Sequence, residues 1–165
     1  METTKNYILS KEAAEKKIRR MALEVTERNF NEPQLILAGI KENGVIIANK
    51  VAAYLSEVFK GEIIVIEIRI DKKQPEFATL NPKIDFSNKT VLLIDDVANS
   101  GKVMLYALQP LLAGYPKSIQ TLALVERTHK NFPLALDYIG LSYSTTQDEH
   151  INVEVEDGQV LGAWM

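Results

Sequence analysis

The sequence predicts an α/β fold in which helices flank a central, mostly parallel β-sheet. Short continuous apolar runs, typical of buried parallel strands, alternate with segments whose apolar residues recur at helical spacing. This alternation occurs three times and is followed by a tail of short β-like pieces, an order that favours right-handed crossovers. A chain of 165 residues is long enough for one substantial core, so we expect a single domain over residues 1–165.

The first half of the chain holds two predicted helices and two predicted strands. Ser10 is a suitable cap for a helix that runs to about Asn29. The run Gln34–Gly39 predicts a buried strand, and Glu62–Ile70 is a β-branched strand. Between them a helix is expected from about Val45 to Phe59. The residues expected to face inward from the two helices are Ala14, Ile18, Met21, Ala22 and Val25 in the first and Ile47, Val51, Leu55, Val58 and Phe59 in the second.

The second half begins with a long polar segment, Asp71–Asn88, which shows no period and is expected to be a functional loop or lid. A buried strand then follows at Thr90–Ile94, with a turn at Asp95–Gly101. The remaining elements expected are a helix over roughly Lys102–Ala113, a strand at Ser118–Val125, and a tail from Asp137 to Met165 with β-like pieces at Asn152–Val155 and Gln159–Ala163. Because parallel sheets bind ligands at the carboxyl ends of their strands, the loops after Gly39 and Ile94 are the first candidates for a site.

The composition excludes several kinds of site. The net charge of -3 gives no global attraction for nucleic acid, although the first helix carries a row of cations that either faces solvent or contacts RNA or an acidic partner. With no cysteine there is no disulfide framework, thiolate zinc site or cysteine nucleophile, and His129 and His150 are too few for a histidine metal site. His150 and Trp164 are interpreted as structural. The sequence shows no apolar run of a signal peptide or membrane span, so we expect a cytoplasmic protein with no membrane partner.

The segment Val91–Val103 carries the chemistry. Its apolar strand ends at two adjacent carboxylates, Asp95 and Asp96, and Ser100-Gly101 then turns into a helix. Backbone N–H groups exposed at such a helix start suit a phosphate monoester. Two carboxylates would repel that phosphate unless a ribose lies between, with its 2- and 3-hydroxyls on the carboxylates and its 5-phosphate in the turn. The alternative is that the two aspartates only cap a turn.

A second glycine-bounded loop, Gly39–Gly44, lies at the corresponding place after another strand. Its glycines permit close approach or unusual backbone angles, and Lys41 could face a diphosphate. By itself this spacing is also compatible with a plain turn.

Val91–Val103 resembles the phosphoribosyl diphosphate (PRPP) signature of type I phosphoribosyltransferases, and the resemblance extends over nearly the whole chain. Further strings follow in the order of one branch, the bifunctional pyrimidine-operon attenuator and uracil phosphoribosyltransferase family. These strings are Glu27–Asn29, Leu37–Lys41, Ile94–Val97, Leu124–His129, Asp137–Gly140 and Glu156–Gly158. The resemblance implies the type I phosphoribosyltransferase fold, with a small β-rich hood over the central sheet.

The resemblance also implies a reaction, in which uracil and PRPP give uridine monophosphate and diphosphate with Mg²⁺. Asp95 and Asp96 are the implied catalytic residues, with Mg²⁺ held through PRPP near them and no direct protein ligand set. The implied binding residues are Val97, Ala98, Asn99, Ser100, Gly101, Lys102 and Val103 for the 5-phosphate, Ile40, Lys41, Glu42, Asn43 and Arg69 for the diphosphate, Lys72 and Lys73 in the lid, and Asp137, Tyr138 and Ile139 in the hood over the base. Asn99 stands where purine enzymes carry an aspartate, which favours a pyrimidine.

The chain departs from this branch at functional positions. Glu42 and Asn43 replace a threonine and an arginine of the diphosphate loop, which weakens attraction for a diphosphate. Val103 replaces a threonine of the cradle, and the lid is short. Three hypotheses therefore stay open: an active uracil enzyme, a weakly active or inactive nucleotide-sensing RNA-binding regulator, and a phosphoribosyltransferase for another base. The branch usually forms dimers or larger assemblies, so a homo-oligomer is expected.

Overall fold

The computed structural model describes residues 4–75, 78–146 and 148–165; Glu76 and Phe77 of the predicted lid and Gln147 of the tail lie outside them. Its elements are β1 (Tyr7–Ser10), α1 (Lys11–Arg28), β2 (Gln34–Ile40), α2 (Asn43–Val58), β3 (Glu62–Arg69), β4 (Thr79–Asn81), β5 (Thr90–Ala98), α3 (Lys102–Leu112), β6 (Ser118–Arg127), β7 (Tyr138–Tyr143), β8 (Asn152–Glu156) and β9 (Gln159–Trp164). The predicted strands and helices are present in the predicted order, and β1 and β4 are additional to them.

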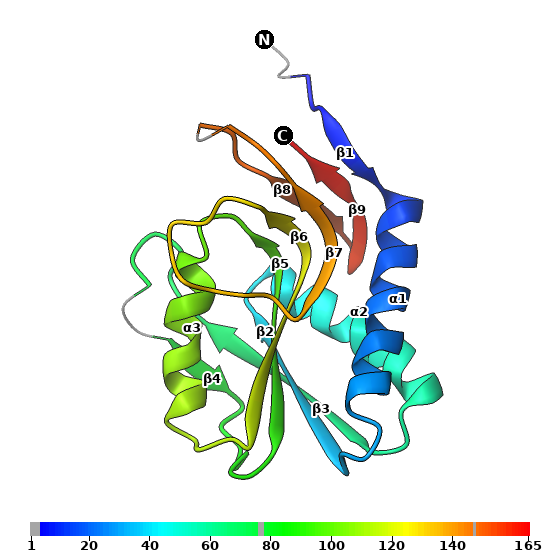
Figure 1. Ribbon diagram of the computed structural model, residues 1–165, viewed down its shortest axis with the longest axis vertical. Helices are drawn as coiled ribbons and strands as arrows, with labels where there is room; N and C mark the ends of the chain where they lie inside the picture. Colours follow the sequence, from blue (N-terminus) through cyan, green and yellow to red (C-terminus); the bar gives the residue numbers. More distant parts are fainter. Residues whose placement is uncertain (1–3, 76–77, 147) are drawn as a thin grey trace.

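A six-stranded sheet in the order β4-β3-β2-β5-β6-β7 forms the centre of the molecule (Figure 1). All neighbours are parallel except β3 and β4, which confirms a mostly parallel sheet. In the register of β2 and β5, Gly39 pairs with Ile94. The loop after β2 and the carboxylates of β5 therefore leave the sheet at the same level.

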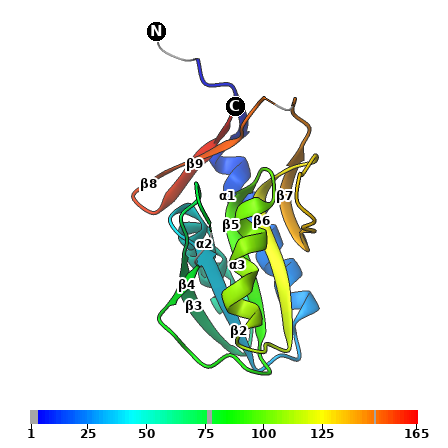
Figure 2. The ribbon, with the colours of Figure 1, turned by 90° about the vertical axis from the view of Figure 1, so that its left-hand side faces the viewer.

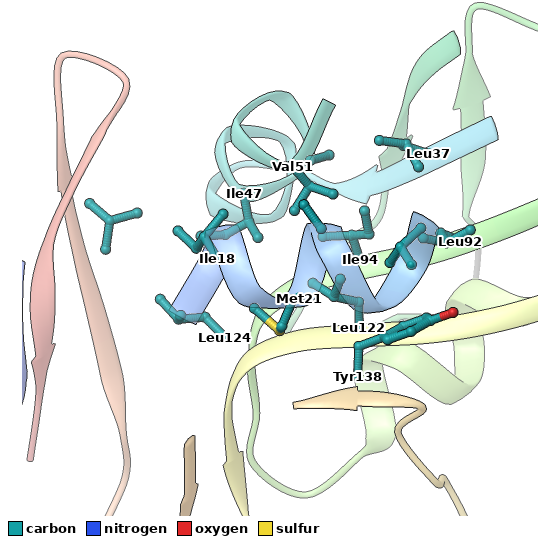
Figure 3. Packing of buried hydrophobic residues seen from close by; sticks show 14 of the residues in the cluster. Ile18, Met21, Leu37, Ile47, Val51, Leu92, Ile94, Leu122, Leu124 and Tyr138 are labelled. Atoms are coloured by element: carbon teal, nitrogen blue, oxygen red, sulfur yellow. The ribbon is translucent and has the colours of Figure 1, made fainter. Parts of the chain in front are cut away.

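Alternate residues of the central strands face opposite layers. On β5, Leu92 and Ile94 pack with the helices α1 and α2, whereas Val91 and Leu93 pack with α3. Figure 3 shows Ile18 of α1 beside the other side chains of the first layer. The central strands are therefore covered on both faces, as their continuous apolar runs predict.

The predicted helix α1 is confirmed with its cap. Ser10 Oγ accepts a hydrogen bond from the Ala13 N–H at 3.1 Å, and every residue of the predicted apolar stripe is buried. Two of its cationic side chains contact β7 and the residue before it. Arg20 donates to the carbonyls of Ile139 and Gly140, and Arg28 pairs with Asp137 at 2.9 Å. In α2 the prediction was wrong for Val58, which is 44% exposed at the last turn.

A separate three-stranded sheet, β1-β9-β8, forms the hood (Figure 2). It joins the two ends of the chain, since β1 pairs antiparallel with β9, and Tyr7 lies opposite Trp164. The sequence prediction missed β1 because it is a four-residue strand whose last residue, Ser10, is also the cap of α1. It also missed β4, a three-residue strand in the predicted lid that pairs antiparallel with β3.

Candidate functional site

Two buried carboxylates lie near the end of β5. The strand runs to Ala98, so Asp95 and Asp96 are strand residues and not the start of a turn, as the sequence had suggested. Asp95 is 2% exposed and Asp96 is 7% exposed. Each Oδ1 accepts the next backbone N–H, from Asp96 and Val97 respectively, at 2.8 Å. This arrangement does more than cap a turn, because it places two anionic groups in a largely desolvated position.

Burial raises the pKa of Asp95 well above its ordinary value, and the neighbouring Asp96 raises it further. Lys72 acts in the opposite direction, with Nζ 3.8 Å from Asp95 Oδ1. Hydroxyl donors or a cation would relieve this destabilised pair, so the site suits a polyol or the ribose of a metal-bound substrate.

The turn after β5 has the backbone geometry that suits an anion cradle. Gly101 has φ of 83°, and α3 begins at the next residue. An added Cβ at Gly101 would have no neighbour closer than 3.4 Å, so the backbone angle, and not lack of space, favours glycine there. Ser100 Oγ accepts the Lys102 N–H at 3.2 Å, and the Ser100 carbonyl accepts the N–H groups of Asn131 and Phe132. The start of α3 thus presents backbone N–H groups from a fixed loop.

The loop Gly39–Gly44 lies beside the carboxylates, and its two glycines are required by close packing. A Cβ at Gly39 would lie 2.8 Å from the Gly44 carbonyl oxygen, and one at Gly44 would lie 2.7 Å from the Ile94 carbonyl oxygen. Lys41 and Glu42, joined by a cis peptide bond, are exposed at the tip. The side chain of Ile40 is fully buried, so only its backbone is available to a ligand.

One cavity of about 490 Å³ gathers most of the predicted site. Its wall is made by Asn43, Lys72, Lys73, the run 95–104 and the run 150–153. A neighbouring groove of about 480 Å³ is lined by Lys41, Glu42, Asn43, Ile70, Asp71 and Lys72. Because Asn43 and Lys72 border both, the cradle and the diphosphate loop open onto one continuous region. Arg69 lines neither cavity and pairs with Glu67 at 3.3 Å.

The predicted position of Asp137, Tyr138 and Ile139 in the hood is wrong. These residues enter β7, which joins the central sheet beside β6 and not the hood. Asp137 pairs with Arg28, and the buried Tyr138 donates from its hydroxyl to Gln120 at 2.6 Å. The ion pair between Asp137 and Arg28 holds α1 against β7. None of the three residues lines the cavity.

The hood contributes a different segment, which the sequence analysis did not select. His150, Ile151, Asn152 and Val153 line the cavity opposite the carboxylates. Asn152–Val155 was predicted as a β-like piece, and that prediction is confirmed by β8, but nothing in its pattern indicates that it crosses to the end of β5. His150, interpreted as structural, is exposed in this wall.

Within residues 4–75, 78–146 and 148–165, no group of three or more His, Cys, Asp or Glu side chains is arranged so that it could hold a metal ion. Asp95 and Asp96 supply at most two carboxylates, so a divalent cation would need further oxygens from a substrate or water. Among the helices described, none has the length and apolarity to cross a membrane.

Comparisons with known proteins agree with this geometry. The family model described as the phosphoribosyl transferase domain matches residues 5–157. A relative named bifunctional protein PyrR, from Streptococcus gordonii, is 36% identical over 150 residues, which cover 86% of this chain and 87% of the relative. A protein of the same name from a Thermoanaerobacter species is 31% identical over 163 residues, covering 93% of this chain and 92% of the relative.

Solved structures show the same fold at lower sequence identity. A hypoxanthine-guanine phosphoribosyltransferase from Bacillus anthracis aligns with a TM-score of 0.71 at 18% identity, covering 90% of this chain and 87% of that one. A hypoxanthine phosphoribosyltransferase from Trypanosoma cruzi aligns with a TM-score of 0.76 at 11% identity, covering 97% and 95%. These similarities concern the fold alone.

Proposed function

The chain belongs to the phosphoribosyl transferase domain family, and from this premise we propose that it transfers ribose 5-phosphate from PRPP to a pyrimidine base, with uracil as acceptor. The observation that carries the proposal is the single cavity in which the buried Asp95–Asp96 pair is continuous with the anion cradle at the start of α3. The relatives' name also supports it, since two activities are expected of a bifunctional protein.

In the proposed reaction, the N–H groups of the cradle bind the 5-phosphate, and Asp95 and Asp96 accept hydrogen bonds from the ribose 2- and 3-hydroxyls. The bond from C1 of the ribose to the diphosphate oxygen breaks with its electron pair on the diphosphate, and a bond forms from C1 to N1 of the base. The N1 proton leaves to solvent. The two carboxylates stabilise the positive charge that develops on the ribose ring. Lys72 and Lys73, which line the same cavity beside Asp95, neutralise the departing diphosphate.

Mg²⁺ fits this site as a companion of PRPP. When bound, the ion supplies charge neutralisation to the diphosphate and sugar oxygens near Asp95 and Asp96. The burial of two adjacent carboxylates, Asp95 at 2% and Asp96 at 7% exposure, is the observation that favours a nearby cation.

Asn99 supports a pyrimidine acceptor, because its side chain lines the cavity and cannot act as a carboxylate base. A second candidate function is a nucleotide-sensing, RNA-binding regulator with little catalysis. It is favoured by Glu42, an exposed anion in the groove where a diphosphate would lie. Assembly as a homo-oligomer and a cytoplasmic location stay predictions.

The test is nucleotide formation from PRPP, Mg²⁺ and each of uracil, cytosine, hypoxanthine and guanine. Uridine monophosphate should form with uracil, and Asp96→Asn should lower the rate at least ~100-fold without a comparable loss of stability. Asp157→Asn is the matched control, since Asp157 is exposed in the β8–β9 turn and asparagine tolerates its φ of 50°. Formation of a purine nucleotide would refute the acceptor. No product with any base, together with tight binding of a structured leader RNA, would favour the regulator.

A further inference from the structure

Two asparagine side chains cross the cavity to the hood. Asn99, in the cradle, donates from Nδ2 to the Ile151 carbonyl at 3.2 Å and accepts at Oδ1 from the Ile151 N–H, also at 3.2 Å. Asn43, at the end of the diphosphate loop, donates from Nδ2 to Asp96 Oδ2 at 2.9 Å and to the Val153 carbonyl at 3.2 Å. The two amides therefore bind alternate residues of the same hood segment.

The hood segment depends on these bonds for its position. Ile151 is 1% exposed and precedes the first residue of β8, so Asn99 satisfies its N–H and its carbonyl at a buried place before the strand begins. Val153 is 7% exposed and pairs with Ala163 of β9. The contact from Asn43 therefore reaches a segment that the hood sheet already holds on its other side.

We infer that Asn43 and Asn99 are positioning residues that form an amide clamp between the carboxylate strand and the hood segment 151–153. As a role in transfer this rests on the proposed function, because the clamp fixes the wall opposite Asp95 and Asp96 and so the distance between ribose and base. Asn43 also orients Asp96, since its Nδ2 contacts a carboxylate oxygen that does not take the Val97 N–H. Asn43 stands where the branch that the sequence resembles has an arginine. The replacement removes a cation that would face the diphosphate, and it supplies an amide that contacts Asp96 and the hood.

Asn43 and Asn99 are half-buried and face the cavity, unlike the fully packed Asn29, whose amide bonds Gln120 beneath α1. A substrate can therefore reach the clamp, and a loss of the clamp should alter ligand binding more than it alters the core.

The first arm of the test is amide hydrogen exchange of the ligand-free protein, read at residues 150–154. Asn99→Ala should accelerate exchange of the Ile151 N–H on the order of tenfold, because the hydrogen bond that protects it is lost. Asn99→Asp keeps the acceptor for that N–H and should give a smaller acceleration. The matched control is Asn49→Ala, an exposed position on the same helix as Asn43, which should leave the hood unchanged. The emission of Trp164, which lies opposite Asn152 in β9, gives an independent optical signal from the hood.

The second arm is the transfer reaction with PRPP and uracil. Asn99→Ala should raise KM for the base on the order of tenfold with a smaller change in kcat, whereas Asn43→Ala should lower kcat because Asp96 loses its orientation. A purely structural role would reduce the folded fraction and leave KM unchanged, and that result would overturn the clamp.

The two proposals fail separately. If wild-type protein makes no nucleotide with any base, the proposed function fails, and the exchange arm still decides whether the clamp holds the hood. If Asn99→Ala folds and its exchange at Ile151 equals that of wild type, the clamp is wrong whatever the activity. If Asn99→Ala does not fold, the same exchange measurement is made on Asn99→Asp and Asn43→Ala. Exchange of residues 150–154 that equals wild type in both variants overturns the clamp.

Discussion

Replacing Asp95 by asparagine should stabilise the fold while abolishing transfer. The amide keeps an oxygen for the Asp96 N–H, which contacts Asp95 Oδ1 at 2.8 Å, and removes a charge that is 2% exposed. Burial destabilises the charged form of Asp95 most, and the like charge of Asp96 adds to it. Interactions of this kind are worth on the order of 1 to 4 kcal/mol near a protein surface. Lys72 offsets part of this repulsion from 3.8 Å, with a side chain that is 45% exposed. We therefore expect Asp95→Asn to raise the unfolding free energy by about 1 to 3 kcal/mol near neutral pH.

The direction of the Asp95 pKa shift determines how the stability difference between the variant and wild type changes with pH. Burial, and then Asp96, raise the pKa of Asp95 in the folded state above its ordinary value of 3.8. Between pH 3.8 and the raised folded-state pKa, the folded protein binds more protons than the unfolded chain. Wild-type stability therefore falls as pH rises through the folded-state pKa. The asparagine variant lacks this loss. Its advantage should be absent below pH 3.8, grow as pH rises through the folded-state pKa and remain constant above it.

Urea unfolding of wild type and Asp95→Asn at pH steps from about 4.5 to 8.5 measures this difference directly. Transfer assays on the same preparations should show a loss of at least ~100-fold. A variant that is less stable than wild type at pH 8, or two stability curves that stay parallel over the whole range, would refute the assignment of Asp95 as a buried, destabilised carboxylate.

Three further changes test other parts of the site and fold. Glu42→Gln removes an exposed anion from the groove and should tighten PRPP binding roughly fivefold, measured by calorimetric titration; unchanged affinity would mean that Glu42 does not face the diphosphate. Gly101→Ala has steric room but must adopt φ of 83°, so thermal unfolding should show a loss of about 1 to 2 kcal/mol and phosphate binding should weaken. Asp137→Asn should cost about 1 kcal/mol at neutral pH: burial raises the pKa of Asp137, but the hydrogen bonds from Arg28 and Thr121 outweigh it and hold the pKa below its ordinary value. That cost should disappear as pH falls through the folded-state pKa, and a cost independent of pH in chemical denaturation would contradict the ion pair.

Sequence reasoning predicted the strand, the two carboxylates and the start of α3 because their signal is local. The apolar strand, the two carboxylates and the glycine before α3 are consecutive, and each has a physical reason that does not depend on the rest of the fold. The same holds for α1, where the Ser10 cap and the apolar stripe specify both the start and the buried face.

The hood side could not be found this way because it depends on pairing between distant segments. Ile151–Val153 reaches the cavity only because β8 pairs with β9 and two asparagines bind its backbone, and neither contact leaves a period or motif in the sequence. Asp137 and Tyr138 were assigned to the base by resemblance, but the partners Arg28 and Gln120 hold them at the start of β7. Strand ends were also misplaced: polar residues predicted a turn at Asp95, whereas β6 pairs with β5 as far as Ala98.

The pairing of β1 with β9 has a consequence for biogenesis. Tyr7 of β1 donates to Glu154 of β8, 147 positions later in the chain, so the hood closes a loop that includes most of the sequence. During synthesis from the N-terminus, β2, β5 and α3 leave the ribosome before β8 and β9, and late closure of so long a loop is slow. In a nascent chain, β5 and the start of α3 would thus emerge while the wall made by residues 150–153 is still missing.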